Sequence, residues 1–222
     1  MSRMTSLRIL TYNVRQLRDD RSAVLRVLRD AAPDVVALQE PPRGPIGRAR
    51  VRRLAEAAGL VPVVSGGGAR TTALLARPSL PVTVHRPQRL PWTLWHTPRG
   101  MAIADISGLR VISVHLGLTA RDRARHLVRI LPVVSAAGGV GCVVAGDLNE
   151  LPGGPSWRRL GMLLRDLTAA SGPTHPARAP RKRIDAVLGT GGLVTSGARA
   201  IADEAGRRGS DHLPVVVDVA WP

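Results

Sequence analysis

The sequence predicts an α/β protein in which two mixed β-sheets pack face to face and helices cover their outer surfaces. Short apolar runs with strand spacing recur along the chain, amphipathic segments with helical spacing lie between them, and no linker is long enough to split the chain. Apolar residues form 44% of the 222 residues, enough for the core of a single domain spanning residues 1–222. Because only 2% are aromatic and Phe is absent, we expect a core of Val, Leu, Ile and Ala.

The first part of the chain predicts alternating strands and helices. Strands are expected over residues 7–14 and 35–38, and helices over residues 22–32 and 49–58. Pro33 ends the first helix and Gly59 ends the second. Residues 41–47, which are rich in Pro and Gly, predict a loop. Five short apolar runs follow, and their separation by Gly, Pro and Ser is typical of antiparallel strands. These runs cover residues 60–64, 72–76, 81–85, 101–106 and 109–115.

The rest of the chain predicts two helices, a loop and four strands. One helix is expected over residues 121–137, with Thr119 as its N-cap, and the other over residues 155–164, which begin with Pro. Residues 171–182 are basic and rich in Pro and predict a loop. The strands are expected over residues 140–145, 184–188, 193–201 and 213–219.

The charge of the chain is strongly positive. Its 32 basic residues, all Arg except Lys182, outnumber the 16 acidic residues and give a formal net charge of +16. Such a field attracts polyanions, so nucleic acid, an anionic membrane surface and small phosphorylated substrates are the candidate partners. Cys142, the single cysteine, lies in an apolar run, which excludes a disulfide framework.

Targeting signals are not apparent in the sequence. The residues near Met1 lack the apolar stretch of a secretory signal. The longest uncharged stretch, residues 130–146, contains Pro132 and several Gly and is not typical of a membrane span. We therefore expect a cytoplasmic protein without stable membrane insertion, and the sequence leaves its oligomeric state open.

Polar residues lie at the ends of the predicted strands. In a mixed sheet, the end of one strand and the start of an antiparallel neighbour share a rim, where α/β proteins bind ligands. We expect the polar residues to converge on such a rim. Five lie at or just after the end of a strand and three lie at the start of one: Asn13, Glu40, His115, Asp147 and Asn149, and then Asp185, Asp211 and His212.

Taken one at a time, most of these residues also have a structural interpretation. Glu40 fits a solvated loop, His115 a hydrogen-bonded structural role, and Asp147 with Asn149 a turn that follows a strand. Asp185 differs, because a carboxylate inside an apolar strand must be paired or bound to something. The coincidence of all eight on one rim favours a functional site.

Six segments resemble the endonuclease/exonuclease/phosphatase superfamily, which includes pancreatic-type deoxyribonucleases, abasic-site endonucleases, neutral sphingomyelinases and inositol-polyphosphate phosphatases. The resemblance extends from Leu7 to Val219 and implies a four-layer sandwich of two sheets between helices. Six motifs in the family's order and spacing are a specific signal, whereas any one of them is weak. The segments are LTYNVR (10–15), VVALQE (35–40), VHLGL (114–118), VVAGDLNELPGGPSW (143–157), RIDAVL (183–188) and GSDHLPVVVDV (209–219).

The resemblance implies a role for each residue on the rim. Glu40 is implied to be the main metal ligand, Asn13 a contact to the metal or the phosphate, and Asp211 an additional acidic contact near the metal. Asp147 is implied to orient or deprotonate the attacking water. Asn149 and His115 are implied to contact the phosphate. Asp185 and His212 are implied to act as a catalytic pair. Whether His212 transfers a proton or stabilises the transition state is left open.

The chemistry of phosphate esters supports a metal at such a site. A phosphodiester repels an incoming anion, so a divalent cation is needed to neutralise charge and polarise the phosphoryl oxygen. Mg²⁺ suits the carboxylate and amide oxygens on offer, and Mn²⁺ is an alternative. Thiolate ligands are absent, which argues against a structural zinc site.

The sequence also departs from the pattern of pancreatic-type nucleases. These enzymes give their first catalytic His an acidic partner from the middle of the chain, but no Asp or Glu lies between Glu56 and Asp105 here. We therefore expect His115 to contribute less than His212. His175 stands where relatives often carry an aromatic residue, and few base-stacking surfaces are expected from so few aromatic residues.

These observations favour a metal-dependent nuclease of low sequence specificity. Arg clusters at residues 48–53, 121–129 and 178–183 support it. The alternative is a lipid or inositol-phosphate phosphoesterase, supported by the apolar run at residues 90–95, which could lie at a membrane interface. A non-catalytic binding module is disfavoured, because every acidic and His position of the site is kept. Fold and motifs do not fix the substrate.

Overall fold

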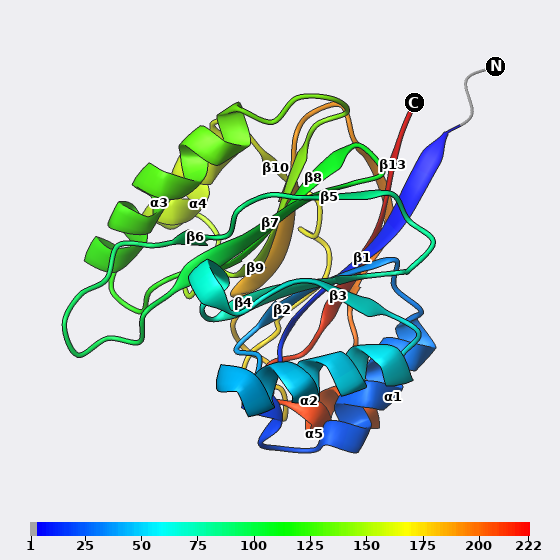
Figure 1. Ribbon diagram of the computed structural model, residues 1–222. Coiled ribbons are helices and arrows are strands. Elements are labelled where there is room, and N and C mark those ends of the chain that lie inside the picture. Colours follow the sequence, from blue (N-terminus) through cyan, green and yellow to red (C-terminus); the bar gives the residue numbers. More distant parts are fainter. Residues whose placement is uncertain (1–3) are drawn as a thin grey trace.

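The computed structural model describes residues 4–222, and Figure 1 shows two β-sheets that face each other between layers of helices. Within the described residues there are thirteen strands and five α-helices. The first and last strands pair with each other, from Thr5 beside Trp221 to Thr11 beside Val215. No helix among residues 4–222 is both long enough and apolar enough to cross a membrane.

The first sheet contains six strands in the order β12-β13-β1-β2-β4-β3. Its strands are β1 (Thr5–Asn13), β2 (Val35–Gln39), β3 (Val61–Ser65), β4 (Thr72–Ala76), β12 (Val194–Ala200) and β13 (Val215–Trp221). β1 runs parallel to β2 and antiparallel to β13, so the sheet is mixed. This arrangement brings the carboxyl ends of β1 and β2 to the same edge.

The second sheet follows the order β10-β11-β9-β8-β7-β5, and β6 pairs with β7 outside that path. Its strands are β5 (Val82–Val84), β6 (Gln88–Arg89), β7 (Gly100–Ile106), β8 (Leu109–His115), β9 (Cys142–Asp147), β10 (Arg165–Asp166) and β11 (Asp185–Gly189). β8 and β9 are parallel, and β11 is antiparallel to β9. The end of β8, the end of β9 and the start of β11 therefore share one edge.

Side-chain caps fix where the longer helices begin. The Asp20 carboxylate accepts a hydrogen bond from the Ala23 amide at 3.0 Å at the start of α1, and Thr119 Oγ1 accepts one from the Asp122 amide at 3.1 Å at the start of α3. The helices are α1 (Arg21–Ala31), α2 (Gly44–Ala57), α3 (Ala120–Ser135), α4 (Pro155–Gly161) and α5 (Glu204–Gly209). Two short 3-10 helices, η1 (Arg15–Leu17) and η2 (Gly67–Ala69), complete the helical elements.

Three apolar cores separate the four layers. Alternate residues of β1 face different cores: Leu7 and Ile9 pack between the two sheets, whereas Leu10 and Tyr12 pack against α1 and α2. In the second sheet, Ile112 of β8 packs against α3 and α4. Both faces of each sheet are thus buried, as in layered α/β proteins. The predicted sandwich of two mixed sheets between helices is confirmed.

Several element boundaries differ from the prediction. α2 begins at Gly44, inside the predicted loop 41–47, because Pro45 fits the first turn of a helix, where its missing N–H has no intrahelical partner to lose. The helix expected over residues 155–164 ends at Gly161. α5 is absent from the prediction, because six residues that include two Gly show no helical periodicity.

Candidate active site

The strand registers bring the predicted rim residues together across both sheets. His115, Asp147 and Asp185 are direct neighbours at the edge of the second sheet, since His115 pairs with Asp147 and Asp147 pairs with Asp185. Asn13 ends β1 in the first sheet, and Glu40 follows the end of β2. Because the two sheets face each other, these ends form one rim.

Asp147 lies at the centre of this rim and is 1% exposed. Its Oδ2 accepts a hydrogen bond from Asn13 Nδ2 at 3.1 Å, which joins the two sheets. Its Oδ1 accepts one from the Asn149 amide at 2.8 Å, and Asn149 Nδ2 donates to the Leu116 carbonyl at 2.9 Å. The carboxylate and the Asn149 side chain are therefore held in fixed orientations.

The backbone around Asp147 is shaped for this packing. Gly146 lies so close to the Val114 carbonyl that a Cβ atom would collide with it. Asn149 and Glu40 both adopt φ of 50°, a left-handed conformation that is uncommon outside glycine. At Glu40 this turn is fixed by a hydrogen bond from its amide to the Thr71 carbonyl at 2.9 Å. Strained backbone of this kind clusters at functional sites.

His212 forms a buried pair with Asp185. Its Nδ1 lies 2.9 Å from Asp185 Oδ2, and its Nε2 lies 3.9 Å from Asp147 Oδ2. A carboxylate at Nδ1 selects the tautomer and orients the ring. Burial alone would lower the pKa of His212, but Asp185, followed by Asp147 and Asp211, raises it to about 10. The ring is therefore oriented with Nε2 toward Asp147, and the surrounding carboxylates favour its protonated form.

His115 has the opposite electrostatic character. Its Nε2 lies 3.4 Å from Asp147 Oδ2, while its Nδ1 is buried without a partner among residues 4–222. The acidic neighbour of His115 is thus Asp147 at the end of the adjacent strand β9, and not a residue between Glu56 and Asp105. Burial and then the charge of Arg99 lower the pKa of His115 well below its ordinary value. Burial and Asp185 raise the pKa of Asp147 to about 6.

The donor groups on this rim fit a hard divalent cation. Ligand atoms of Asp147, Asp185 and His212 lie within 4.8 Å of one another, and a second group of this kind contains His175, Asp211 and His212. Because His212 is paired with Asp185, the carboxylates of these groups are the members suited to a cation. Glu40 belongs to neither group. Its carboxylate is 3.9 Å from His115 Nε2, beyond hydrogen-bond distance, and its side chain is 30% exposed. Carboxylate oxygens without tight partners are the ligands that Mg²⁺ and Mn²⁺ prefer.

Arg99 is a site residue that sequence reasoning missed. It is 9% exposed, its Nη1 is buried without a partner among residues 4–222, and the acidic groups with the largest effect on its pKa are Asp147 and Glu40. Burial lowers its pKa below the ordinary arginine value. Its sequence position, after Pro98 and directly before β7, does not distinguish it from the other arginines of the chain.

Two of the predicted Arg clusters are partly internal. Arg123 is buried on α3 and pairs with Glu150 at 2.9 Å. Arg183 pairs with Asp166 at 2.6 Å and covers the Trp157 ring at 4.8 Å from its centroid. These two side chains stabilise the loops around the rim and are not free to contact a polyanion. The support that these two clusters lend to nucleic-acid binding is reduced accordingly.

A four-layer sandwich whose rim gathers carboxylates, amides and an Asp–His pair defines the class of phosphoesterases that depend on a metal. The chain belongs to the endonuclease/exonuclease/phosphatase family, whose model matches residues 10–212. Comparison with curated proteins gives no match.

Solved structures share this fold along almost the whole chain. The endonuclease/exonuclease/phosphatase from Bacteroides vulgatus is 16% identical with a TM-score of 0.78, covering 98% of this chain and 100% of that one. D. rerio TDP2 complexed with single strand DNA product is 19% identical with a TM-score of 0.73, and the match covers 97% of this chain and 99% of that one. ANGEL2, a 2',3'-cyclic phosphatase in complex with adenosine-2',3'-vanadate, is 13% identical with a TM-score of 0.71, covering 98% and 96%.

Proposed function

We propose that this chain is a metal-dependent phosphodiesterase that cleaves nucleic acid with little sequence preference. The observation that carries the proposal is the buried pair of Asp185 and His212, directed at Asp147 on a rim that also holds Asn13 and Glu40. This arrangement offers a cation site, a proton acceptor and an oriented imidazole close to one another. Those are the requirements for hydrolysis of a phosphate ester.

In this proposal each rim residue has one task. Glu40, with Asn13 and Asp211 nearby, would hold Mg²⁺ or Mn²⁺, which supplies charge neutralisation and polarises the phosphoryl oxygen. Asp147 orients the attacking water and accepts its proton. The other residues act on the phosphate: Asn149 and His115 position it, and His212, oriented by Asp185, stabilises the charge that develops on it.

Charge favours nucleic acid as the substrate. The chain carries a net charge of +16, and no base-reading element is apparent. Phosphate contacts supply affinity without sequence information, so low specificity follows. Among proteins of the same fold, TDP2 was solved with a single strand DNA product and ANGEL2 with an adenosine-2',3'-vanadate. The same proposal places the reaction in the cytoplasm.

A second candidate is the hydrolysis of a lipid or inositol phosphate. The observation that favours it is the loop of residues 91–97, where Trp92, Leu94 and Trp95 are 50%, 61% and 91% exposed. Apolar side chains exposed in this way can enter a membrane interface. The candidate needs this loop to meet a lipid surface beside the rim.

A substrate panel separates the two candidates. Purified protein with Mg²⁺ is assayed on plasmid DNA, single-stranded DNA, RNA, abasic duplex, sphingomyelin and inositol phosphates at two salt concentrations. We expect cleavage of nucleic acid that weakens steeply with salt, because each neutralised phosphate releases counterions. His212→Ala, prepared in the same way, is the control for a contaminating nuclease. Hydrolysis of lipid or inositol phosphate alone, with no nucleic acid cut, would overturn the proposal.

A further inference from the structure

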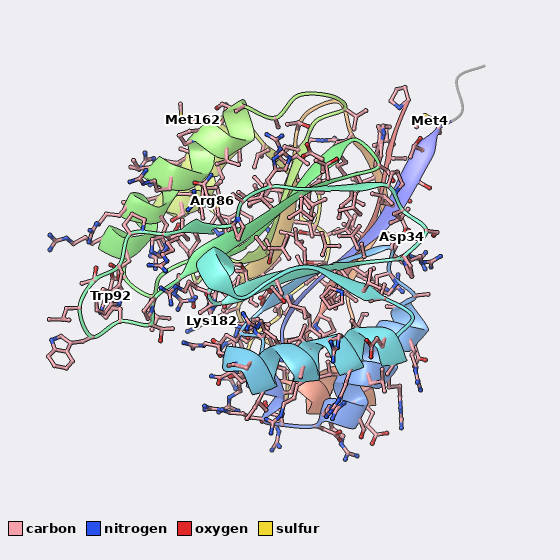
Figure 2. All side chains as sticks on the ribbon, viewed as in Figure 1. Met4, Asp34, Arg86, Trp92, Met162 and Lys182 are labelled. Carbon is pink, nitrogen blue, oxygen red and sulfur yellow. The ribbon has the colours of Figure 1, made fainter. Side chains whose placement is uncertain are left out.

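The exposed aromatic surface of the described residues lies in one loop. Of the four Trp and one Tyr of the chain, Tyr12, Trp157 and Trp221 are buried, whereas Trp92 and Trp95 are 50% and 91% exposed. Both exposed rings lie in the loop of residues 91–97 between β6 and β7. Figure 2 shows Trp92 on this loop at the edge of the molecule. An aromatic ring left in water carries a cost that a ligand can relieve.

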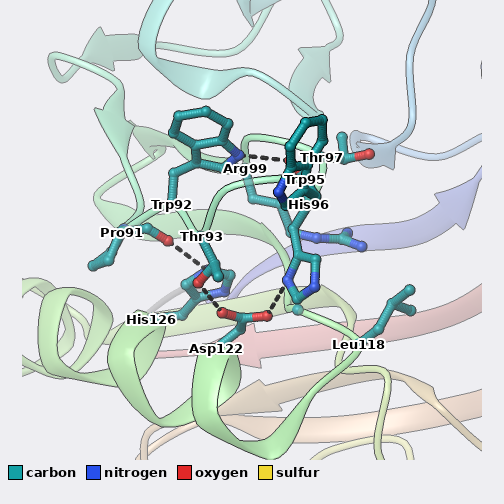
Figure 3. Close-up of a pocket in the computed structure, with 11 residues that line it drawn as sticks. Pro91, Trp92, Thr93, Trp95, His96, Thr97, Arg99, Leu118, Asp122 and His126 are labelled. Atoms are coloured by element: carbon teal, nitrogen blue, oxygen red, sulfur yellow. Dashed lines mark hydrogen bonds and ion pairs between the residues drawn. The ribbon is translucent and has the colours of Figure 1, made fainter.

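Hydrogen bonds to Asp122, Arg125 and His126 tie this loop to the start of α3. Thr93 Oγ1 donates to Asp122 Oδ1 at 2.6 Å, and His96 Nδ1 lies 2.6 Å from Asp122 Oδ2. Trp92 Nε1 donates to the His96 carbonyl at 2.6 Å, which closes the loop on itself, as Figure 3 shows. The Trp92 ring is therefore held in place before any ligand arrives, which reduces the entropic cost of binding.

A cavity of about 170 Å³ lies between this loop and the segment that leaves the rim. Its walls include Trp92, Trp95 and Arg99 on one side and Gly117 and Leu118 on the other. Gly117 follows the rim residue His115 by two positions. The cavity is smaller than the roughly 300–1,000 Å³ of sites for drug-sized ligands, so it suits one planar group.

Arg99 joins this cavity to the candidate active site. It lines the cavity and is itself 9% exposed. The charges of Asp147 and Glu40 on the rim raise its pKa, against the lowering effect of burial. Its Nη1 is buried and has no hydrogen-bond partner among residues 4–222. A buried donor without a partner is costly, and an anionic ligand at this position would supply the missing acceptor.

We propose that the cavity and its two Trp rings bind an unstacked nucleobase of a single-stranded nucleic acid, while Arg99 binds the phosphate beside that base. The inference rests on the proposed function and adds the strand state of the substrate. The Trp rings would stack on the base and the Arg99 cation would bind the phosphate, so together they match the two parts of one nucleotide. In a duplex, neighbouring base pairs cover both faces of a base, so only an unpaired base can stack on Trp95. The net charge of +16 favours an anionic ligand, and the vesicle measurement below separates nucleic acid from an anionic lipid surface.

The test measures binding of labelled oligonucleotides by fluorescence anisotropy, with Mg²⁺ and in the His212→Ala background so that strands stay intact. The probes are a ten-residue oligothymidylate and an abasic strand with the same number of phosphates. Trp95→Ala should weaken oligothymidylate binding roughly 5- to 150-fold, the range found for loss of one base–aromatic stack. Binding of the abasic strand should not change. Trp95→Phe should restore most of the affinity.

Matched variants separate stacking from other roles of the loop. Leu94→Ala removes an exposed apolar side chain of the same loop that cannot stack, so it should leave oligothymidylate binding within about twofold. Arg99→Gln should weaken both strands alike, because its contact is with phosphate. Circular dichroism of each variant verifies folding. Unchanged binding by Trp95→Ala, or an equal loss for both strands, would overturn the base site, and unchanged binding by Arg99→Gln would overturn the phosphate contact.

Two further measurements identify the alternatives. If Trp95→Ala and Leu94→Ala both lose binding to phosphatidylglycerol vesicles while oligothymidylate binding is unaffected, the loop meets a lipid surface and the inference is wrong. Hydrolysis of bis(p-nitrophenyl) phosphate, which has no nucleobase, depends on the rim alone. Its absence in the wild type, together with Trp95-dependent binding of oligothymidylate, would overturn the proposed function and leave the base site standing.

Discussion

The buried ion pair between Arg123 and Glu150 should contribute strongly to stability. Arg123 Nε and Nη2 donate to Glu150 Oε1 at 3.2 and 2.9 Å, and Nη1 donates to the carbonyls of Gly117 and Leu118 at 3.2 and 2.7 Å. The two side chains are 11% and 8% exposed. Arg123→Met removes all four hydrogen bonds and leaves the Glu150 carboxylate buried without its cation.

Removal of one partner of a buried pair costs about 3–5 kcal/mol, so we expect the free energy of unfolding to fall by that amount. At this chain length 1 kcal/mol shifts Tm by about 2–4 °C, which predicts a decrease in Tm of roughly 6–20 °C. Urea unfolding followed by circular dichroism measures the change. The double variant Arg123→Met with Glu150→Gln should recover part of the loss, because the Gln oxygen still accepts from the Ser156 amide, 2.6 Å from Glu150 Oε2.

The size of the loss decides whether this reasoning holds. A fall in the free energy of unfolding of less than about 1 kcal/mol is typical of an exposed ion pair. Such a small fall would refute the expectation that the pair of Arg123 and Glu150 behaves as a buried one. A double variant no more stable than Arg123→Met would show that the cost does not come from the uncompensated carboxylate. The slope of unfolding with urea should stay unchanged in all variants, since the folded state is the same.

Three further predictions concern the rim and the loop beside it. His212→Ala should lower kcat by about 10²-fold or more on a single-stranded substrate, because removal of one group that stabilises transition-state charge costs roughly 10²–10³. His115→Ala should cost less, because its Nδ1 has no carboxylate partner among residues 4–222 that orients the ring. Gly146→Ala should reduce the free energy of unfolding in urea by about 1–3 kcal/mol, because its Cβ would collide with a carbonyl of β8. Burial opposes ionisation of Asp122, but hydrogen bonds from residues of the adjacent loop and from Thr119 lower its pKa to about 2. Its stabilising effect is present above its unfolded pKa of about 4 and is lost as pH falls toward 2, which Trp fluorescence should report.

Each of these predictions has a control and a result that opposes it. Near wild-type kcat in His212→Ala would remove His212 from the mechanism, and unfolding curves exclude a trivial loss of structure. For Gly146, the comparison is Gly161→Ala, where an added Cβ meets nothing within 4 Å, and equal stability of the two variants would contradict the collision. For Asp122, the variant Asp122→Asn should lack the fluorescence change between pH 4 and 2, and an identical change in that variant would assign it to other groups.

The sequence was sufficient for the fold because the apolar pattern repeats on both faces of the strands. In β1, Leu7 and Ile9 alternate with Leu10 and Tyr12, and each set fills a different core. That alternation can be seen without a structure. The start of α2 could not be predicted from the sequence, because the Pro and Gly of residues 41–47 suit a loop as well as the start of a helix. Only packing decides between these two conformations.

The candidate site was only partly accessible to sequence reasoning. Positions at strand ends predicted which side chains share an edge, and the registers of Asp147 with His115 and with Asp185 show that they do. Their roles in catalysis stay a prediction. Arg99 escaped because its significance depends on burial and an unpartnered Nη1, which no spacing reveals. The arginine clusters misled in part, because Arg123 is neutralised inside the fold.

The dependence of activity on metal tests the account's central claim most directly. Wild type and Glu40→Gln are dialysed against chelator, and hydrolysis of single-stranded DNA is measured as Mg²⁺ or Mn²⁺ is added back. We predict no turnover in chelator, full recovery of the wild type with either metal, and for Glu40→Gln a strong loss that raised metal concentration only partly reverses. Undiminished turnover of the wild type in excess chelator, with no metal bound to the protein, would contradict the account.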